Sequence, residues 1–138
     1  MEKEQILELM NGSKQESLMR TLEIDFVDVG DDFLIARMPV TPKVHQPDGV
    51  LHGGATFALA ESVGSAAAYL FNKSKSTMVR GIEMSGNHLK GIREGFVYAK
   101  AQAIHNGRTT QIWEIKVTNE AGDLISSCKL TTLTLPKK

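Results

Sequence analysis

The side chains best suited to chemistry lie between positions 46 and 65, in the segment QPDGVLHGGATFALAESVGS. From His52 to Phe71, Glu61 is the only charged residue of a largely apolar stretch. If this stretch is one buried helix, an unpaired carboxylate within it carries a large desolvation cost. Glu61 is therefore expected either to serve as a general base or to pair with a lysine or arginine from a strand, and the pattern alone leaves both open.

Gly53 and Gly54 stand where this helix would begin. The first amides of a helix have no internal partner, and the helix dipole places partial positive charge there. Because glycines carry no side chain, a carbonyl oxygen can approach these amides closely, as an oxyanion hole for acyl transfer requires. The alternative is that the two glycines only permit a tight turn from loop to helix.

Three polar residues accompany these candidates. Ser65 follows Glu61 by four residues and so shares its helix face, which Ser62 flanks; small neighbours there leave room for a ligand. His52 can be a base, a metal ligand or a hydrogen-bonding residue that holds the loop before the helix. Gln46 can orient a carbonyl or a water, or simply anchor its loop.

Other kinds of site find less support in the sequence. The four histidines are scattered, with no pair four residues apart, so no metal site is expected: His45, His52, His88 and His105. No GxSxG elbow surrounds a serine, and neither a P-loop nor a GxGxxG motif is present. Lys90 and Arg93 lie at a turn and can receive ligand phosphates, although cations at turns are more often solvated.

Composition narrows the class of protein. The 138 residues carry sixteen basic and sixteen acidic side chains, so no overall field favours nucleic acid or an anionic membrane. The single cysteine, Cys128, excludes an intramolecular disulfide and is expected to be a buried structural thiol. The first ten residues do not resemble a secretory signal, which predicts a cytoplasmic location. The apolar run 55–71 contains Glu61 and many small residues, which favours a buried helix over a membrane span.

The pattern along the chain predicts one α+β domain over residues 1–138. A helical segment over 1–21 is expected, with a break near Asn11-Gly12-Ser13. A hairpin and then a long helix follow, the helix apolar on all sides. The remaining turns separate further strands, and one antiparallel six-stranded sheet must cover that helix, which leaves one side uncovered and favours a dimer or tetramer. The expected ranges are Leu22–Phe26 and Phe33–Val40 for the hairpin, Gly54–Asn72 for the helix, and Met78–Leu89, Phe96–His105, Thr109–Thr118 and Leu124–Leu135 for the strands.

The segment QPDGVLHGGATFALAESVGS, together with RGIEMSGNHLKGIREG downstream, closely resembles the hotdog-fold acyl-CoA thioesterases of the phenylacetic-acid-degradation type. Members of this family include the 1,4-dihydroxy-2-naphthoyl-CoA thioesterases of menaquinone synthesis and 4-hydroxybenzoyl-CoA thioesterases. The likeness extends from about Leu22 to Leu135. It implies a curved sheet around a central helix, and dimers that pair into tetramers.

The resemblance also implies roles for individual residues. Glu61 would be the catalytic carboxylate, as general base or as nucleophile, and would face the HGG loop of a partner subunit. Gly53 would donate its amide to the thioester oxygen, with His52 and Gln46 near the thioester. Further residues would hold water, the acyl group or coenzyme A: Ser65 and Ser62 on the helix, Gly54 at its start, and His88, Lys90 and Arg93 along the cleft.

The sequence therefore predicts hydrolysis of an acyl-CoA thioester to a free acid and CoA, with no cofactor beyond the CoA of the substrate. An aromatic acyl group is favoured. A medium-chain fatty acyl group stays an alternative, as do a dehydratase acting on acyl thioesters and a non-catalytic module that binds acyl-CoA.

Overall fold

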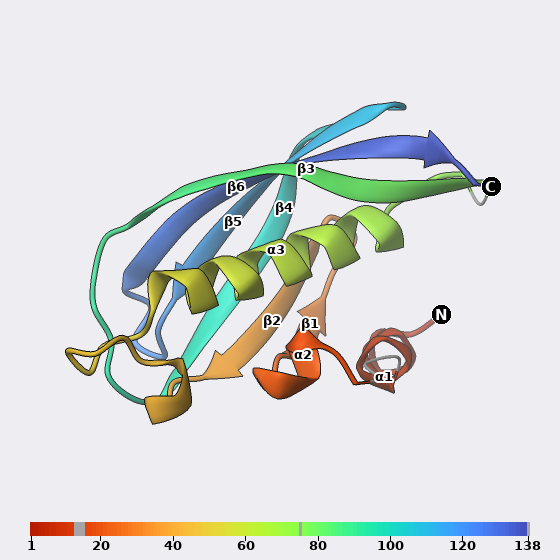
Figure 1. Ribbon diagram of the computed structural model, residues 1–138. Helices are drawn as coiled ribbons and strands as arrows, with labels where there is room; N and C mark the ends of the chain where they lie inside the picture. The colour runs from red at the N-terminus through yellow and green to blue at the C-terminus, as the bar shows by residue number, and fades with distance from the viewer. Residues whose placement is uncertain (13–15, 75, 138) are drawn as a thin grey trace.

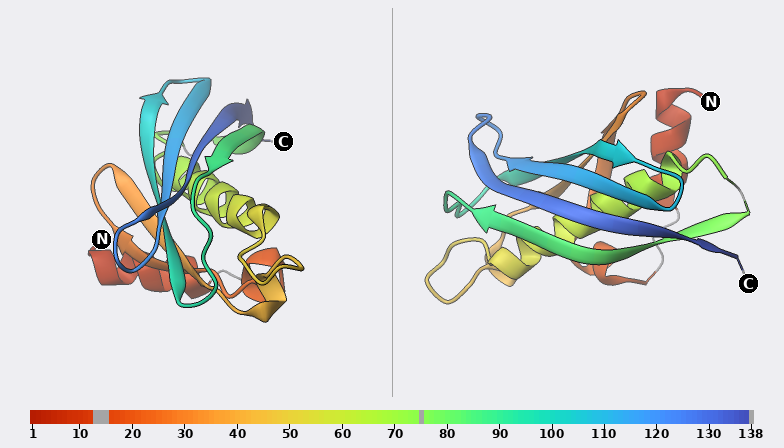
Figure 2. Two further views of the ribbon diagram at one scale, coloured as in Figure 1. Left: turned by 90° about the vertical axis from the view of Figure 1, so that its left-hand side faces the viewer. Right: turned by 90° about the horizontal axis from the view of Figure 1, so that it is seen from above.

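The computed structural model describes residues 1–12, 16–74 and 76–137. Six antiparallel strands form one sheet in the order β1-β2-β4-β5-β6-β3, and the long helix α3 (Gly53–Leu70) packs on its concave face (Figure 1). Figure 2 shows the sheet curving around this helix. The α+β hotdog arrangement predicted from the sequence is thus confirmed. The strands are β1 (Asp25–Val29), β2 (Phe33–Pro39), β3 (Thr77–His88), β4 (Phe96–Asn106), β5 (Thr110–Thr118) and β6 (Leu124–Pro136).

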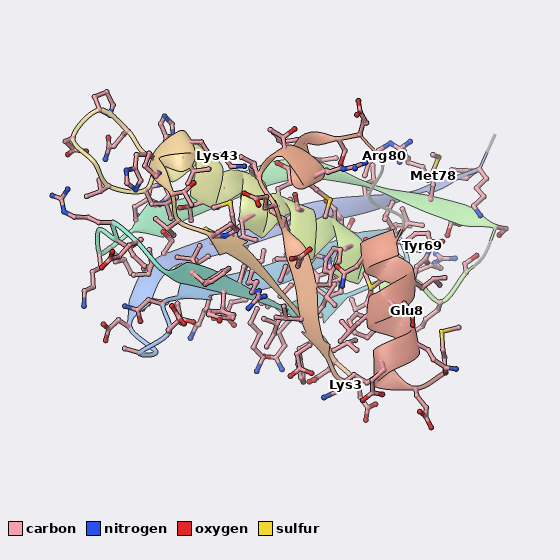
Figure 3. All side chains as sticks on the ribbon, turned by 90° about the horizontal axis from the view of Figure 1, so that it is seen from below. Lys3, Glu8, Lys43, Tyr69, Met78 and Arg80 are labelled. Atoms are coloured by element: carbon pink, nitrogen blue, oxygen red, sulfur yellow. The ribbon has the colours of Figure 1, made fainter. Side chains whose placement is uncertain are left out.

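The N-terminal segment contains two helices, as predicted, α1 (Lys3–Gly12) and α2 (Leu18–Thr21). Ser13 of the predicted break lies outside the described residues. The ammonium of Lys3, a residue of α1 labelled in Figure 3, contacts the Asp28 carboxylate at 2.7 Å, and this ion pair joins α1 to β1. The Asn11 side chain also bonds both the N–H and the C=O of Phe26, as a neighbouring strand would. These contacts fix α1 against the first hairpin.

The first strand begins later than the sequence predicted, because the chain turns sharply before it. Leu22 caps α2 and Glu23 has a φ of 58°, so the extended backbone starts at Asp25 and not at Leu22. The other predicted elements agree with the observed ones to within two residues. A 3-10 turn, η1 (Pro42–Val44), lies in the proline-rich loop that leads to α3.

Small residues let α3 lie close to the sheet. A Cβ atom on Gly64 would come within 2.7 Å of Leu130 Cδ2 and 3.3 Å of Ile115 Cδ1, so the helix backbone itself packs on β5 and β6 there. Ala60 and Ala67, one turn to either side, are completely buried. The helix buries this face and leaves the opposite one open, where the Tyr69 side chain is 75% exposed. The single chain thus leaves one side of the helix uncovered, as the sequence predicted.

No helix in the described ranges combines the length and hydropathy needed to cross a bilayer. The cysteine also agrees with its prediction. Cys128 is 4% exposed in β6, and burial raises the pKa of its thiol to about 11.

We expect Gly64→Ala to lower the free energy of unfolding. Overpacking against Leu130 costs roughly 1–3 kcal/mol, which exceeds the helix-propensity gain of about 1 kcal/mol from replacing glycine by alanine. Urea denaturation measures the difference. Gly12→Ala is the matched control, because a Cβ there meets no atom within 4 Å. Equal unfolding midpoints for the two variants would contradict the close packing of α3.

We also expect the native protein to react very slowly with an aromatic disulfide thiol reagent at neutral pH. The Cys128 thiol stays protonated and out of reach, whereas the thiolate is the reactive form. Unfolding in guanidinium should release one reactive thiol per chain, the single cysteine. Complete modification of the folded protein within seconds would disprove the burial.

Candidate active site

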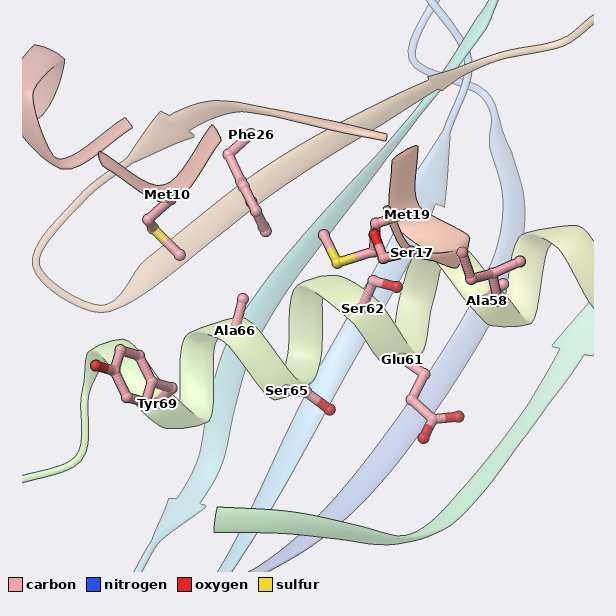
Figure 4. A pocket seen from close by; sticks show the side chains of 11 residues that line it. Met10, Ser17, Met19, Phe26, Ala58, Glu61, Ser62, Ser65, Ala66 and Tyr69 are labelled. Atoms are coloured by element: carbon pink, nitrogen blue, oxygen red, sulfur yellow. The ribbon is translucent and has the colours of Figure 1, made fainter. Parts of the chain in front are cut away.

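Glu61 and Ser65 lie on the same side of α3 and face strand β3, as their spacing predicts (Figure 4). Their neighbour is Gly81 of β3. A Cβ atom on Gly81 would lie 3.4 Å from Glu61 Oε2 and 3.8 Å from Ser65 Oγ. The missing side chain leaves space beside the carboxylate and the hydroxyl. Sequence reasoning missed Gly81, although a glycine inside a strand is a recognised sign of a close approach.

The Glu61 side chain is exposed in the single chain, which corrects the expectation of a buried carboxylate. Within residues 1–12, 16–74 and 76–137, no lysine or arginine forms an ion pair with it. The described residues therefore do not show the alternative role for Glu61, an ion pair with a lysine or arginine of a strand. The Glu61 carboxylate can instead contact a ligand or a second protein molecule.

An open pocket of about 770 Å³ runs along this face of α3. Glu61, Ser62 and Ser65 supply polar groups from the helix, while the N-terminal segment and β1 contribute much of the apolar lining (Figure 4). The apolar side chains are Met10, Leu18, Met19, Phe26, Ala58, Ala66 and Tyr69, and Ser17 completes the lining. The pocket thus joins an unpaired carboxylate to a surface suited to an apolar group.

His52 caps the start of α3 and uses up most of its free amides. Its ring Nδ1 accepts a 2.8 Å hydrogen bond from the Gly54 amide, and its carbonyl accepts from Ala55 and Thr56 at 3.0 and 3.2 Å. Within the described part of the chain, the remaining amide of the first turn, that of Gly53, donates to no protein group. The loop-holding role considered for His52 is thus what the structure displays, and Gly53 keeps a free donor.

His88 lies directly beside Gly53. A Cβ atom on Gly53 would fall 2.6 Å from His88 Nε2, so only glycine leaves room for this ring. On its other side, His88 Nδ1 is 2.8 Å from the hydroxyl of Ser126, which is completely buried in β6. Gln46 and Lys90 line the same pocket of about 410 Å³. Sequence reasoning missed Ser126, because β6 carries several serines and threonines and no local signal distinguishes this one.

Lys90 and Arg93, the predicted phosphate ligands, each have a protein partner. The Lys90 ammonium lies 2.8 Å from the Asp123 carboxylate, and this hydrogen bond, more than a second one from Asn119, lowers the pKa of Asp123. The Arg93 guanidinium donates to the carbonyl of Asp48 at 3.1 Å and so braces the loop before α3. A ligand phosphate would have to compete with these contacts.

Histidine, cysteine, aspartate and glutamate side chains do not gather in groups of three or more anywhere in the described chain, so no cluster suited to a metal ion is found there.

The candidate residues form two separate groups. Glu61, Ser62 and Ser65 lie along the middle of α3, whereas Gln46, His52, Gly53, Gly54 and His88 lie at its start. Eight residues of helix separate Gly53 from Glu61, which is about 12 Å along the axis. A carboxylate and an amide that act on one carbonyl group must each come within about 3 Å of it. Within one chain, the backbones of the two groups are therefore well separated along the helix.

Comparisons with known proteins agree with one another. A family model described as the thioesterase superfamily matches residues 48–126. The 1,4-dihydroxy-2-naphthoyl-CoA hydrolase of Escherichia coli K12 is 41% identical over 129 residues, which cover 94% of each protein. A proofreading thioesterase of Cronobacter turicensis is 40% identical over 126 residues, 91% of each protein. The crystal structure of a mutant thioesterase from Pseudomonas aeruginosa matches with a TM-score of 0.92 and 42% identity, over 95% of this chain and 94% of that one.

Proposed function

The chain belongs to the thioesterase superfamily, and we propose that it hydrolyses an aromatic acyl-CoA thioester with Glu61 as the catalytic carboxylate. The observation that carries the proposal is the unpaired Glu61 carboxylate opening into an apolar pocket. Water supplies the hydroxyl of the product acid, the carbonyl carbon–sulfur bond breaks, and the CoA thiolate takes up the proton. Glu61 acts either as general base on that water or as nucleophile on the carbonyl carbon. The reaction needs no cofactor beyond the CoA of the substrate.

The separation of the two residue groups supports a site shared between two copies of the chain. In this arrangement, Glu61 of one protomer faces the free Gly53 amide of its partner, which stabilises the developing oxyanion. Strand β3 offers a means of pairing, because it forms one edge of the sheet and the side chain of Ile82 on it is 57% exposed. The proposed assembly is a homodimer with two such sites, which can pair into a tetramer.

The pocket beside Glu61 supports the choice of acyl group. Its lining includes Phe26 and Tyr69 with two methionines, Met10 and Met19, which suit a flat aromatic group. The naphthoyl substrate named for the Escherichia coli relative is of that kind. A medium-chain fatty acyl group is the second candidate, because most of the residues that line this pocket are apolar. A screen of thiol release over aromatic and aliphatic acyl-CoAs ranks the two by kcat/KM.

Glu61→Gln should lower turnover of the best acyl-CoA by at least about 100-fold, since it removes the base or nucleophile while keeping the side chain's size. Thiol release measures the rate. Glu114→Gln is the matched control, because Glu114 pairs with Lys116 and lies outside both groups of site residues. A loss of tenfold or less in Glu61→Gln would contradict the assignment. If acyl-CoA binds with no turnover in the unaltered protein, the chain is a binding module.

Mixing two inactive variants should restore activity if the site is shared. Gly53→Pro deletes the free amide at the first helical position, where proline fits the backbone, and His52 already has the extended conformation that precedes proline. Refolded together, Gly53→Pro and Glu61→Gln chains should form mixed dimers in which one site has both groups intact. We expect recovery of up to about a quarter of the unaltered activity, from statistical mixing with one intact site in each mixed dimer.

Gly53→Ala controls for crowding, because its Cβ meets His88 as the proline ring would, while the amide remains. The difference in kcat between Gly53→Ala and Gly53→Pro reports the amide alone. Mixtures with no more activity than the separate variants would place the whole site within one chain.

A further inference from the structure

We propose that Ser126 fixes the His88 imidazole with its proton on Nε2, and that this N–H is a second donor, beside the Gly53 amide, to the thioester oxygen. The role of His88 toward substrate rests on the proposed function. The orientation of the His88 ring is argued only from its contacts in the structure. Ser126 is in this view a positioning residue, since it acts through His88 and touches no substrate.

The burial of Ser126 decides which atom carries the proton. Its hydroxyl is completely buried in β6, a strand paired on both sides, and its partner is His88 Nδ1 at 2.8 Å. A buried hydroxyl proton needs an acceptor, and the Nδ1 lone pair provides one. If Nδ1 carried the proton instead, the Ser126 hydroxyl oxygen would accept a hydrogen bond from Nδ1–H. The hydroxyl proton of Ser126 would then need another acceptor, and the described residues offer no other side-chain partner for it. The neutral ring is therefore protonated on Nε2.

Two further contacts hold the His88 ring beside the start of α3. The Phe57 ring packs against the imidazole, with centroids 5.0 Å apart, and Nε2 lies 2.6 Å from the Cβ position of Gly53. The Gly53 amide nitrogen is two covalent bonds from that position, so it lies within about 6 Å of Nε2. One oxygen atom can then lie about 2.9 Å from both nitrogens. This separation leaves room for the free amide and the imidazole N–H to bind the same oxyanion, as the proposal requires.

The arrangement also gives Gly53 a second reason to be glycine. A side chain there would push the imidazole away from the helix start, because Ser126 and Phe57 already fix two sides of the ring. The glycine therefore serves the His88 donor as well as its own amide.

The tautomer can be measured without any substrate. Long-range ¹H–¹⁵N correlation spectra of the neutral form should show His88 protonated on Nε2 in the unaltered protein, with His88→Ala identifying the signal. In Ser126→Ala, the ring should populate both tautomers. A ring protonated on Nδ1 in the unaltered protein would overturn the proposal. Because this readout needs no turnover, it also holds if the protein proves not to hydrolyse acyl-CoA.

Kinetics test the role toward substrate. His88→Ala should lower kcat about 100-fold, as expected for the loss of one oxyanion donor. Ser126→Ala should lower kcat about tenfold with KM changed less than about twofold. In the His88→Ala background, Ser126→Ala should have no further effect on kcat, since it acts through the ring.

Ser127→Ala is the matched control, on the same strand but only partly buried and outside the site pockets; its kcat should be unchanged. If Ser126→Ala and His88→Ala lower kcat independently, Ser126 has only a structural role and the proposal fails. If the unaltered protein showed no thioesterase activity, the proposed function would be refuted. The NMR spectra would still determine the tautomer of His88.

Discussion

The fixed rise of an α-helix is the constraint on which the rest of the site depends. Glu61 and the free Gly53 amide belong to one rigid helix, so the distance of about 12 Å between their backbones cannot be closed by any motion of a loop. In the proposed shared site, the carboxylate and the amide donor come from different molecules. A second copy of the chain would then cover the open face of α3 and the unpaired edge of β3.

Close packing of α3 determines where those groups are presented. Gly64 brings the helix backbone against Leu130 and Ile115, and the alanines beside it keep the buried face flat. With that face fixed on the sheet, the helix pitch places Glu61 and Ser65 toward Gly81 of β3. Two glycines thus have complementary roles: Gly64 lets the helix approach the sheet, and Gly81 leaves space beside the Glu61 carboxylate. Both effects result from the absence of a side chain.

The sequence was sufficient for most of the helices and strands, because their periodicity is a local signal, and the HGGA and ESVGS segments were sufficient to nominate candidate residues. It was insufficient where the outcome depends on contacts between distant segments. The pairing of His88 with Ser126 requires the register of β3 against β6, which no local pattern reveals. The exposure of Glu61 was misjudged because an apolar helix shows hydrophobic residues on every side, whether the cover comes from its own sheet or from a second chain. The first strand was placed too early because the turn at Glu23 has no glycine to mark it.

The capping of α3 shows how one residue can select a single donor from four. A helix start presents four free amides, and each of them attracts negative charge. The amide of His52 itself donates to the Val44 carbonyl, and His52 accepts from two others, the Gly54 amide through its ring and the Ala55 amide through its carbonyl. Within the described part of the chain, only the Gly53 amide is then left to a ligand, next to the His88 ring. Because the other donors are already satisfied, the carbonyl oxygen of the proposed substrate would have one preferred position at this helix start, and little reorganisation would be needed when charge develops on it.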